Sequence, residues 1–335
     1  MLKSFADVLD IYNGKNQKQV EDIDGVYPIY GSGGIMGYAN DYICPESTVI
    51  IGRKGSINKP IYVTSPLWNV DTAFGLVAKK DILNPKYLYY FCEYFDFERL
   101  NTTVTIPSLT KANLLKIRIK VPELNVQANI VERLDKVKYI IQKCQEELKL
   151  LDNLIKSRFV EMFGKERNRM SMSDLCSIIT DGTHQPPKFV EEGIPFVFVA
   201  NIAGDKLTYE TNKFISQETY DELIKRTPIE IGDILLSTVG SYGHPAVVKL
   251  DKKFLFQRHI AYLKPKKAIV DSNYLHGALL SPDVQRQIEE DVRGIAQKTL
   301  NLSAIKKMTI PVPNINRQKE FADFVTQTTK LKLAG

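Results

Sequence analysis

Cysteine and histidine are scarce in this chain of 335 residues, with four of each. The cysteines (Cys44, Cys92, Cys144 and Cys176) form no CxxC pair, and the histidines have no spacing typical of metal ligands. We therefore expect no disulfide framework and no zinc site, which favours a reducing, cytoplasmic environment. No run approaches 18 apolar residues, and the N-terminus lacks an uninterrupted apolar segment, so neither a membrane span nor a secretion signal is expected.

The motifs of common enzyme classes are also missing. The chain contains no P-loop, no HExxH and no GxSxG sequence. The glycine cluster at 31–34 is not followed by a helix start, and QPPK at 185–188 lacks the asparagine and the aromatic residue of an amino-methyltransferase loop. ELK at 147–149 resembles a nuclease ExK but has no partner aspartate. We therefore expect no catalytic residues, no metal and no cofactor in this chain.

The overall composition is that of an ordinary globular protein. Hydrophobic residues make up 44% and charged residues 25%, and the length suits two domains rather than one. The net charge of +6 is compatible with an anionic partner but does not by itself distinguish one from generic solubility.

Residues 123–163 carry the strongest periodic signal. Their apolar residues alternate at spacings of four and three, and no proline or glycine interrupts them. A 3.5-residue repeat held over about four heptads is typical of a coiled-coil seam. A helix of about 40 residues spans roughly 60 Å, and its apolar stripe is exposed to water unless a partner helix covers it. One long helix packed on a globular core is the alternative. The predicted seam comprises Ile130, Leu134, Val137, Ile141, Cys144, Leu148, Leu151 and Ile155.

Five short segments recur in the same order in the two halves of the chain. The offset between copies grows from 167 residues (174 − 7) to 191 (313 − 122), so the second copy carries about two dozen extra residues. We infer an internal repeat. The matched segments are 7–11 with 174–178, 25–30 with 193–198, 48–56 with 233–241, 84–88 with 271–275, and Pro122 and Gln127 with Pro313 and Gln318.

Each copy is predicted to be a mixed α/β (α+β) domain followed by a long helix. Short apolar runs bounded by turn residues predict strands at 48–51, 61–63, 73–77, 195–199, 233–236 and 260–263. One further helix is predicted in each copy, at 85–100 and at 273–293. The predicted boundaries are 1–121 for the first domain, 122–164 for its helix, 165–312 for the second domain and 313–335 for a shorter distal helix. The distal helix carries Phe321 and Val325 at seam positions.

Polar and basic loops with glycine occupy matched places in the two copies. Glycine lets the backbone approach a phosphate, Lys or Arg neutralises it, and Arg, Asn and Gln read base edges in the major groove. Many such residues only shape turns. Two different polar sets on one repeated framework nevertheless suit the reading of two different short DNA sequences. In the first copy the candidate DNA-contacting residues are Ser32, Arg53, Lys54, Ser56, Asn58, Lys59, Asn69, Thr103, Ser108 and Lys111. In the second they are Thr183, His184, Lys188, Ser241, Tyr242, His244, Arg258, His259, Lys298 and Asn301.

Several short motifs, taken together with the heptad helix, carry a resemblance to a known family. They are PIYGSGG at 28–34 and GRKGS at 52–56 in the first copy, and DGTH at 181–184, GIP at 193–195 and GDIL at 232–235 with Gly240 in the second. The Pro-x-x-x-x-Gln starts of the two long helices complete the set. Over nearly its whole length the chain resembles the specificity subunit of a type I restriction-modification system.

The resemblance implies a non-catalytic DNA-recognition subunit with two target-recognition domains in tandem. In such subunits the two helices pair as an antiparallel coiled coil, each domain reads one half of a bipartite site in double-stranded DNA, and the helices set the gap. They also dock two modification (methyltransferase) subunits, which bind S-adenosylmethionine and methylate adenine. Restriction (endonuclease and translocase) subunits join that complex. The short distal helix departs from this pattern and implies an incomplete pair, either because the chain was shortened or because a second chain completes it.

Other interpretations remain open at this point. A stand-alone sequence-specific DNA-binding protein, such as a repressor, predicts tight specific binding by the isolated chain. A protein-binding scaffold predicts no salt-dependent binding of DNA. A fused methyltransferase needs a cofactor pocket for which the sequence shows no motif.

Overall fold

The structure is a computed structural model that describes residues 1–101, 107–292 and 298–334, with the side chains of residues 203, 333 and 334 left aside. The chain divides into two compact units, Met1–Lys143 and Cys144–Gly335. The division falls inside one 40-residue helix, α4 (Leu124–Phe163), so each unit contains one half of this helix.

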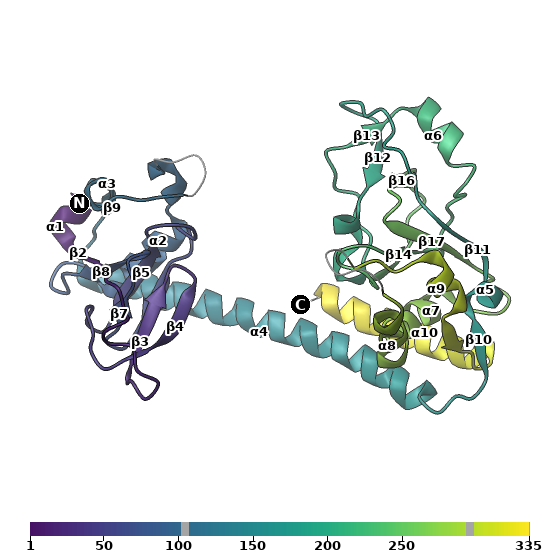
Figure 1. The fold of residues 1–335 in the computed structure, drawn as a ribbon, viewed down its shortest axis with the longest axis horizontal. Helices are drawn as coiled ribbons and strands as arrows, with labels where there is room; N and C mark the ends of the chain where they lie inside the picture. The colour runs from purple at the N-terminus through teal and green to yellow at the C-terminus, as the bar shows by residue number, and fades with distance from the viewer. Residues whose placement is uncertain (102–106, 293–297, 335) are drawn as a thin grey trace. The chain divides into compact units, whose positions relative to one another are not determined.

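Unit 1 (Met1–Lys143) is built on a four-stranded antiparallel sheet with the order β2-β8-β5-β6 (Figure 1). The strands are β2 (Leu9–Asn13), β8 (Ala73–Ala78), β5 (Thr48–Gly52) and β6 (Ile61–Val63). A three-stranded sheet has the order β4-β3-β7, formed by β4 (Gly34–Ala39), β3 (Tyr27–Gly31) and β7 (Trp68–Asn69). The strands β1 (Leu2–Ser4) and β9 (Arg118–Lys120) form a separate pair. The short helices are α1 (Phe5–Val8), α2 (Pro85–Tyr94), the 3-10 helix η1 (Phe97–Leu100) and α3 (Lys111–Leu115).

Helix α2 begins where the sequence predicts and ends earlier. The Asn84 side chain accepts hydrogen bonds from the backbone N–H groups of Lys86 and Tyr87, and Pro85 occupies the first turn, where its missing N–H costs nothing. Phe95 then adopts an extended conformation, and the Asp96 side chain caps η1. The predicted helix 85–100 is therefore two shorter helices.

Unit 2 (Cys144–Gly335) repeats the three sheets of unit 1. Its four-stranded antiparallel sheet has the order β11-β17-β14-β15, its three-stranded sheet the order β13-β12-β16, and β10 pairs with β18. The strands are β10 (Arg169–Ser171), β11 (Cys176–Asp181), β12 (Ile194–Val197), β13 (Phe214–Ile215), β14 (Ile234–Ser237), β15 (Pro245–Val247), β16 (Leu255–Phe256), β17 (Ile260–Pro265) and β18 (Thr309–Pro311). The helices, besides the second half of α4, are α5 (Met172–Leu175), the 3-10 helix η2 (Val199–Asp205), α6 (Gln217–Leu223), α7 (Ser272–Leu279), α8 (Pro282–Asp291), α9 (Leu302–Lys307) and α10 (Ile315–Ala334).

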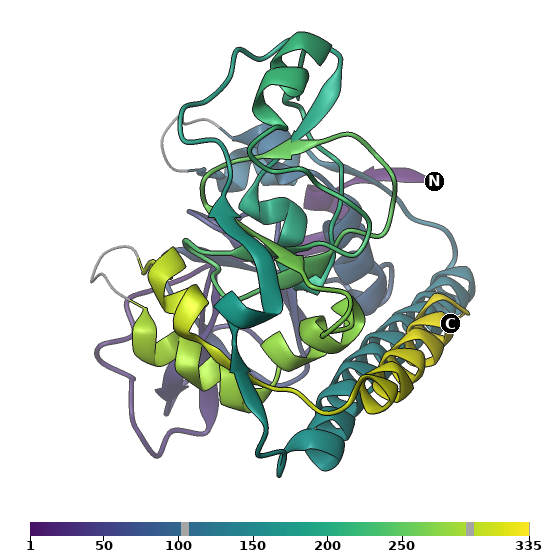
Figure 2. The ribbon, with the colours of Figure 1, turned by 90° about the vertical axis from the view of Figure 1, so that its right-hand side faces the viewer.

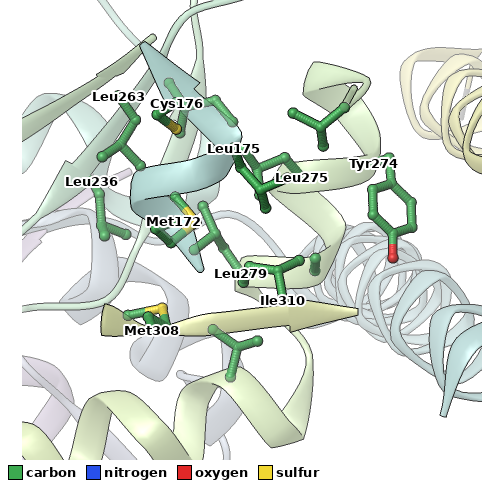
Figure 3. Packing of buried hydrophobic residues seen from close by; sticks show 14 of the residues in the cluster. Met172, Leu175, Cys176, Leu236, Leu263, Tyr274, Leu275, Leu279, Met308 and Ile310 are labelled. Carbon is green, nitrogen blue, oxygen red and sulfur yellow. The ribbon is translucent and has the colours of Figure 1, made fainter. Parts of the chain in front are cut away.

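The largest core of unit 2 lies between α5, α7, β18 and the four-stranded sheet. Figure 3 shows Met172 and Leu175 of α5 meeting Leu275 and Leu279 of α7, with Ile310 of β18 on the same cluster, and all five side chains are buried. At roughly 1.5–3 kcal/mol for each large apolar side chain, this cluster contributes a large share of the driving force that folds the unit.

The helix predicted at 273–293 is also divided. Helix α7 ends at Leu279, Ser281 is extended, and α8 starts at Pro282. A residue before proline is disfavoured in helical conformation, and the Ser281 hydroxyl accepts from the N–H of Val284 as the cap of α8. The last predicted residue, 293, lies outside the described part of the chain.

The internal repeat is confirmed in hydrogen-bonding detail. Asp271 caps α7 as Asn84 caps α2, in each case accepting from the second and third residues that follow. The Tyr87 hydroxyl donates to the carbonyl of Lys120 at 2.9 Å, and the Tyr274 hydroxyl donates to that of Pro311 at 2.6 Å. Each bond ties the helix after the four-stranded sheet to the strand that precedes a long helix.

Most of the extra residues of the second copy lie in one region. The offset between equivalent strands is 167 at β3 and β12 (194 − 27), 186 at β5 and β14 (234 − 48), and 191 at β9 and β18 (309 − 118). The segment between β12 and β14, which contains η2 and α6, is therefore longer by 19 residues (186 − 167). The order of the strands is the same in both copies, although this segment is longer in the second.

Within unit 2, α10 lies along the second half of α4 (Figure 2). The Arg317 guanidinium donates to the carbonyl of Met162 at 3.1 Å, and Phe321 packs edge-to-face on Phe159 at 5.3 Å between ring centroids. Nearer the end of α10, Lys332 forms an ion pair with Asp152. Residue numbers therefore fall along α4 as they rise along α10, so this contact is antiparallel.

The predicted seam is covered only in part. Phe159, Phe163 and Phe321 are buried, with Ile155 and Val325 packed against them, and Leu151 is half-buried. Ile130 and Cys144 are also half-buried. Leu134, Val137, Ile141 and Leu148 expose 37%, 51%, 52% and 41% of their surface. A continuous helical pairing along the whole predicted seam is therefore not present within this chain's described residues.

Candidate nucleic-acid interface

In unit 1 the loop after β5 is held from both sides by backbone hydrogen bonds. The N–H of Arg53 donates to the carbonyl of Thr72 at 2.7 Å, and the carbonyl of Arg53 accepts from the N–H of Leu109 at 2.9 Å. The Arg53 side chain is exposed, with its guanidinium carbon 5.7 Å from the centre of the Phe74 ring. The peptide is thus held in place while the guanidinium projects toward solvent.

The hairpin between β3 and β4 reaches this loop at Gly52. A Cβ added at Gly52 would lie 2.4 Å from the carbonyl oxygen of Ser56 and 3.1 Å from the Cβ of Ser32. Gly55, with a φ of 80°, occupies the left-handed region that glycine adopts at low cost. Glycine at position 52 therefore lets Ser32 and Ser56 lie close to the residue that precedes Arg53.

The other predicted residues of unit 1 differ in their availability. Lys54 and Lys59 are exposed. The Asn58 amide bonds to Asp96 at 2.9 Å and accepts from the N–H of Phe97 at 2.7 Å, and the Lys111 ammonium donates to the carbonyl of Ile11 at 2.7 Å, so both support the loops from within. Ser108 is half-buried in a bridge with Lys54, and Thr103 lies outside the described residues.

The prediction for Asn69 is wrong in this structure. Asn69 is fully buried, and its amide accepts from the thiol of Cys44 and donates to the carbonyls of Tyr12 and Ala73. A buried side-chain amide with these partners has no surface left for a base. Asn69 therefore belongs to the framework, where it joins β7 to its neighbours.

In unit 2 four predicted residues line one hollow of about 670 Å³. His184, Arg258, His259 and Asn301 are all among its walls, together with Asp181, Thr238, Val239, Thr299, Leu300, Leu302 and Ser303. The walls come from the loops after β11, β14 and β16 and from the start of α9, which are far apart in the sequence. The fold thus collects side chains that the sequence scatters over more than one hundred residues.

Hydrogen bonds between side chains order this hollow. The imidazole Nε2 of His184 lies 2.9 Å from Asp181 Oδ2, and the Nε–H of Arg258 donates to Nε2 of His259 at 3.2 Å. Burial, and then the charge of Arg258, lower the pKa of His259 below its ordinary 6.5. His259 is therefore neutral at pH 7 and accepts the hydrogen bond that orients Arg258.

The remaining predicted residues of unit 2 surround these walls in different ways. Lys188, Ser241 and Lys298 are exposed. Thr183 is half-buried and exchanges backbone hydrogen bonds with β16 and Arg258, Tyr242 packs on the large core, and His244 Nδ1 lies 2.8 Å from Asp205 Oδ1. The last two side chains are partly used for internal contacts.

The two loops share one backbone frame. Thr238 occupies in unit 2 the place of Arg53, since its N–H donates to the carbonyl of His259 at 3.0 Å and its carbonyl accepts from the N–H of Leu300 at 2.8 Å. A short bridge follows in both units, between Lys54 and Ser108 and between Val239 and Thr299. The same clamp therefore presents different side chains in the two units.

Sequence reasoning missed one cationic side chain beside the hollow. The Nη2 group of Arg226 donates to Asp181 Oδ1 at 2.6 Å, and it lies 3.5 Å from His184 Nε2. Arg226 follows α6, in the longer segment of the second copy, and is 45 residues from Asp181 in sequence. No local pattern links the two residues, so only the fold could reveal the pair.

Other kinds of site are not found in the described ranges. They hold no group of three or more His, Cys, Asp or Glu side chains that could bind a metal ion. In the same ranges no helix is long and apolar enough to cross a membrane. All four cysteines are free.

Both units match one known family of protein domains. A family model described as the type I restriction modification DNA specificity domain matches twice, at residues 1–150 and 168–334. The two matches identify the two units as tandem DNA specificity domains. The chain belongs to the family of type I restriction-modification specificity subunits, whose members are the non-catalytic DNA-recognition components of their complexes.

Relatives from bacteria and archaea agree with this assignment. The type I restriction enzyme EcoBI specificity subunit of Escherichia coli is 25% identical over 320 residues, which are 85% of this chain and 67% of that protein. A putative type I restriction enzyme specificity subunit of Haemophilus influenzae is 24% identical, with 82% and 74% covered. The MjaVIII specificity subunit of Methanocaldococcus jannaschii is 21% identical, with 90% and 79% covered.

Solved structures show the same fold. The S subunit of a type I restriction-modification system from M. genitalium matches with a TM-score of 0.59 and 14% identity over 99% of this chain and 90% of that one. A chain from a study of complex assembly and conformational transition of the type I R-M system matches with a TM-score of 0.55 and 15% identity, covering 100% and 91%.

Proposed function

We propose that each unit reads one half of a bipartite site in double-stranded DNA. The observation that carries this proposal is the backbone clamp shared by Arg53 and Thr238, which holds an exposed arginine in unit 1 and a buried threonine beside the polar hollow in unit 2. Base contacts by Arg and Asn side chains specify sequence, whereas exposed lysines such as Lys54, Lys59, Lys188 and Lys298 neutralise phosphates. Two unlike surfaces on one frame suit two unlike half-sites.

The long helices, in this proposal, pair as an antiparallel coiled coil and set the gap between the half-sites. The contact of α10 with residues 152–163 of α4 supports the direction of the pairing. The exposed seam residues Leu134, Val137, Ile141 and Leu148 are the surface that a further helix or a partner subunit would cover, because such an apolar stripe is costly to leave in water.

The partners follow from the family. Two modification subunits would dock on the helices, bind S-adenosylmethionine and methylate one adenine in each half-site, after rotating it out of the duplex. Restriction subunits would join this assembly, and the chain itself would hold no cofactor. Its place would be the cytoplasm, where its DNA substrate lies.

Adenine methylation mapping tests this function. The chain is co-expressed with the modification subunit encoded beside it in a host without adenine methyltransferases, and the methylated sites are sequenced. We expect one bipartite motif with an unread gap and one methylated adenine on each side. A contiguous motif, or no methylation by a well-assembled complex, contradicts the proposal.

DNA binding by the isolated chain separates the alternatives. A stand-alone repressor binds its site tightly without partners, and a protein-binding scaffold shows no salt-dependent DNA binding at all. The proposed function predicts weak binding by the chain alone, with tight, salt-dependent binding once the modification subunits are added.

A further inference from the structure

Beside the hollow of unit 2, a carboxylate sets the position of an arginine, Arg226. The Asp181 carboxylate accepts from Arg226 Nη2 at 2.6 Å with one oxygen and lies 2.9 Å from His184 Nε2 with the other. The Asp181 side chain is 17% exposed, whereas those of Arg226 and His184 are 53% and 54% exposed. A mostly buried acid therefore holds two exposed nitrogen-bearing side chains at one edge of the hollow.

The backbone that carries Asp181 is itself constrained. Asp181 is the last residue of β11 and pairs with Ala261 of β17. The next residue, Gly182, donates its N–H to the carbonyl of Ile260, and a Cβ added there would lie 2.3 Å from the carbonyl oxygen of Phe256. The sheet therefore determines where the carboxylate points.

The guanidinium retains donors for a ligand. Among the described residues, only Nη2 of Arg226 has hydrogen-bond partners, namely Asp181, Thr180 at 3.4 Å and His184 at 3.5 Å. The Nη1 and Nε groups still carry their N–H donors. A guanidinium presents two parallel donors along its Nη1/Nη2 edge or along its Nε/Nη2 edge. A ligand with two acceptors would therefore bind Nη1 or Nε together with the second N–H of Nη2, and the carboxylate leaves the arginine little rotamer entropy to lose.

We propose that Arg226 is a specificity-determining residue that reads a guanine in the half-site of unit 2, with Asp181 as its positioning residue. Guanine presents two acceptors, O6 and N7, in the major groove, and this edge matches the paired donors of arginine. The inference rests on the proposed function. It assigns one base of one half-site to Arg226, a residue outside the backbone clamp that the two units share. Arg226 lies in the longer segment between β12 and β14, so unit 1 need not read its half-site in this way.

The role of Asp181 distinguishes this proposal from a plain phosphate contact. A carboxylate near the DNA backbone repels phosphates, so its removal alone would strengthen non-specific binding. If Asp181 positions Arg226, its removal instead costs discrimination at the base that Arg226 reads. Removal of the carboxylate should therefore raise the affinity for non-specific DNA and lower the discrimination between bases at one position.

The test uses the complex of the full chain with its modification subunits. Arg226→Ala, Arg226→Lys and Asp181→Asn are compared with the wild type by methylation mapping and by binding to duplexes that carry each single base change. We expect all three variants to lose discrimination at the same single position of the second half-site, by about 5- to 140-fold for Arg226→Ala. The first half-site stays unchanged, and Asp181→Asn binds non-specific DNA at least as tightly as the wild type.

Lys225→Ala is the matched control, because it removes the same charge from the exposed neighbouring residue. It should weaken binding of all sequences alike and leave the motif intact. Thermal unfolding of every variant checks that the fold is retained. The inference is overturned if Arg226→Ala keeps full discrimination, or if Asp181→Asn changes a different position. A wild-type complex without any bipartite motif would instead refute the proposed function.

Discussion

Gln127 and Gln318 make the same three hydrogen bonds at the starts of the two long helices. The Gln127 side chain accepts from the N–H of Asn84 at 2.8 Å and donates to the carbonyls of Ile82 and Pro122. The Gln318 side chain accepts from the N–H of Asp271 at 3.0 Å and donates to the carbonyls of Ile269 and Pro313. Each glutamine therefore ties the start of a long helix to the globular domain before it.

Replacement of either glutamine by leucine should destabilise one unit only. Gln127→Leu leaves three backbone groups without partners, and we expect the free energy of unfolding of unit 1 to fall by about 1–3 kcal/mol. Gln318→Leu should do the same to unit 2. Urea unfolding, followed by hydrogen exchange in each unit, measures this. The exposed Asn129→Leu is the control, and equal loss in both units would contradict independent folding.

Gly277 and Phe321 offer a test of the contact between α7 and α10. A Cβ added at Gly277 would lie 2.5 Å from Phe321 Cε1. Alanine in a helix is otherwise favoured over glycine by about 1 kcal/mol, whereas overpacking costs about 1–3 kcal/mol. We expect Gly277→Ala to lower the unfolding temperature, and Phe321→Leu in the same chain to reverse part of that loss. Strict additivity of the two changes would show that the side chains do not meet.

Stability of unit 2 should depend on His276. Burial lowers the pKa of this imidazole below its ordinary 6.5, although a hydrogen bond to the carbonyl of Asp205 opposes the shift. The unfolded chain then binds a proton at a higher pH than the folded one, so stability contributed by the neutral form is complete above pH 6.5 and falls as the pH drops below it.

His276→Gln should flatten this dependence between pH 6.5 and 5, as measured by urea unfolding at several pH values. His184→Gln changes an exposed histidine of the same unit and serves as the control. If the wild type and His276→Gln have the same dependence of unfolding free energy on pH, other groups cause the loss of stability at acid pH.

Arg53→Ala and Arg258→Ala should each weaken recognition of one half-site. Both guanidinium groups are exposed on loops of different units, and a bidentate base contact contributes about 1–3 kcal/mol of discrimination. Methylation mapping with each variant shows which half-site changes. Arg118→Ala and Arg286→Ala remove exposed arginines elsewhere in the same units and should leave both halves intact. Equal loss at both half-sites would contradict independent reading.

An insertion in α4 tests its role as spacer. Four residues added after Leu148 lie outside the segment 152–163 that contacts α10, and they lengthen the helix by about 6 Å. We expect a gap longer by about two base pairs, at 3.4 Å each, with both half-sites unchanged. Replacement of the exposed Glu147, Lys149 and Leu150 by alanine is the control, because it changes the same region without changing the length of the helix. An unchanged gap would refute the role.

Much of the fold was predictable because its signals are long or repeated. The helix predicted at 123–163 is observed at Leu124–Phe163, since forty residues without proline or glycine leave few alternatives. The repeat was visible because turn residues recur in order, and the strand order repeats with them. Short helices were predicted less well, because Phe95 and the Ser281–Pro282 pair end them by local conformations that hydrophobic spacing does not reveal.

The loops that carry the candidate residues could be located from the sequence, whereas the contacts of the individual side chains could not. Arg258 and His184 were predicted as polar loop residues, and the structure brings both to the hollow of unit 2. Asn69 looked equally polar, yet its amide satisfies backbone groups inside the core. Arg226 could not be found at all, because its partner Asp181 is distant in sequence and Arg226 lies in the segment that is longer in the second copy.

Because one continuous helix belongs to both units, its residue count controls rotation as well as length. Each residue turns the helix by about 100°, so four added residues leave a net twist of about 40°, whereas seven leave about −20°. DNA also winds as it lengthens, by one turn in about 10.5 base pairs. In the proposed spacer role, both units would face their bases at those helix lengths whose angular phase matches the winding of the intervening duplex, so gap lengths in this family should be restricted to certain values.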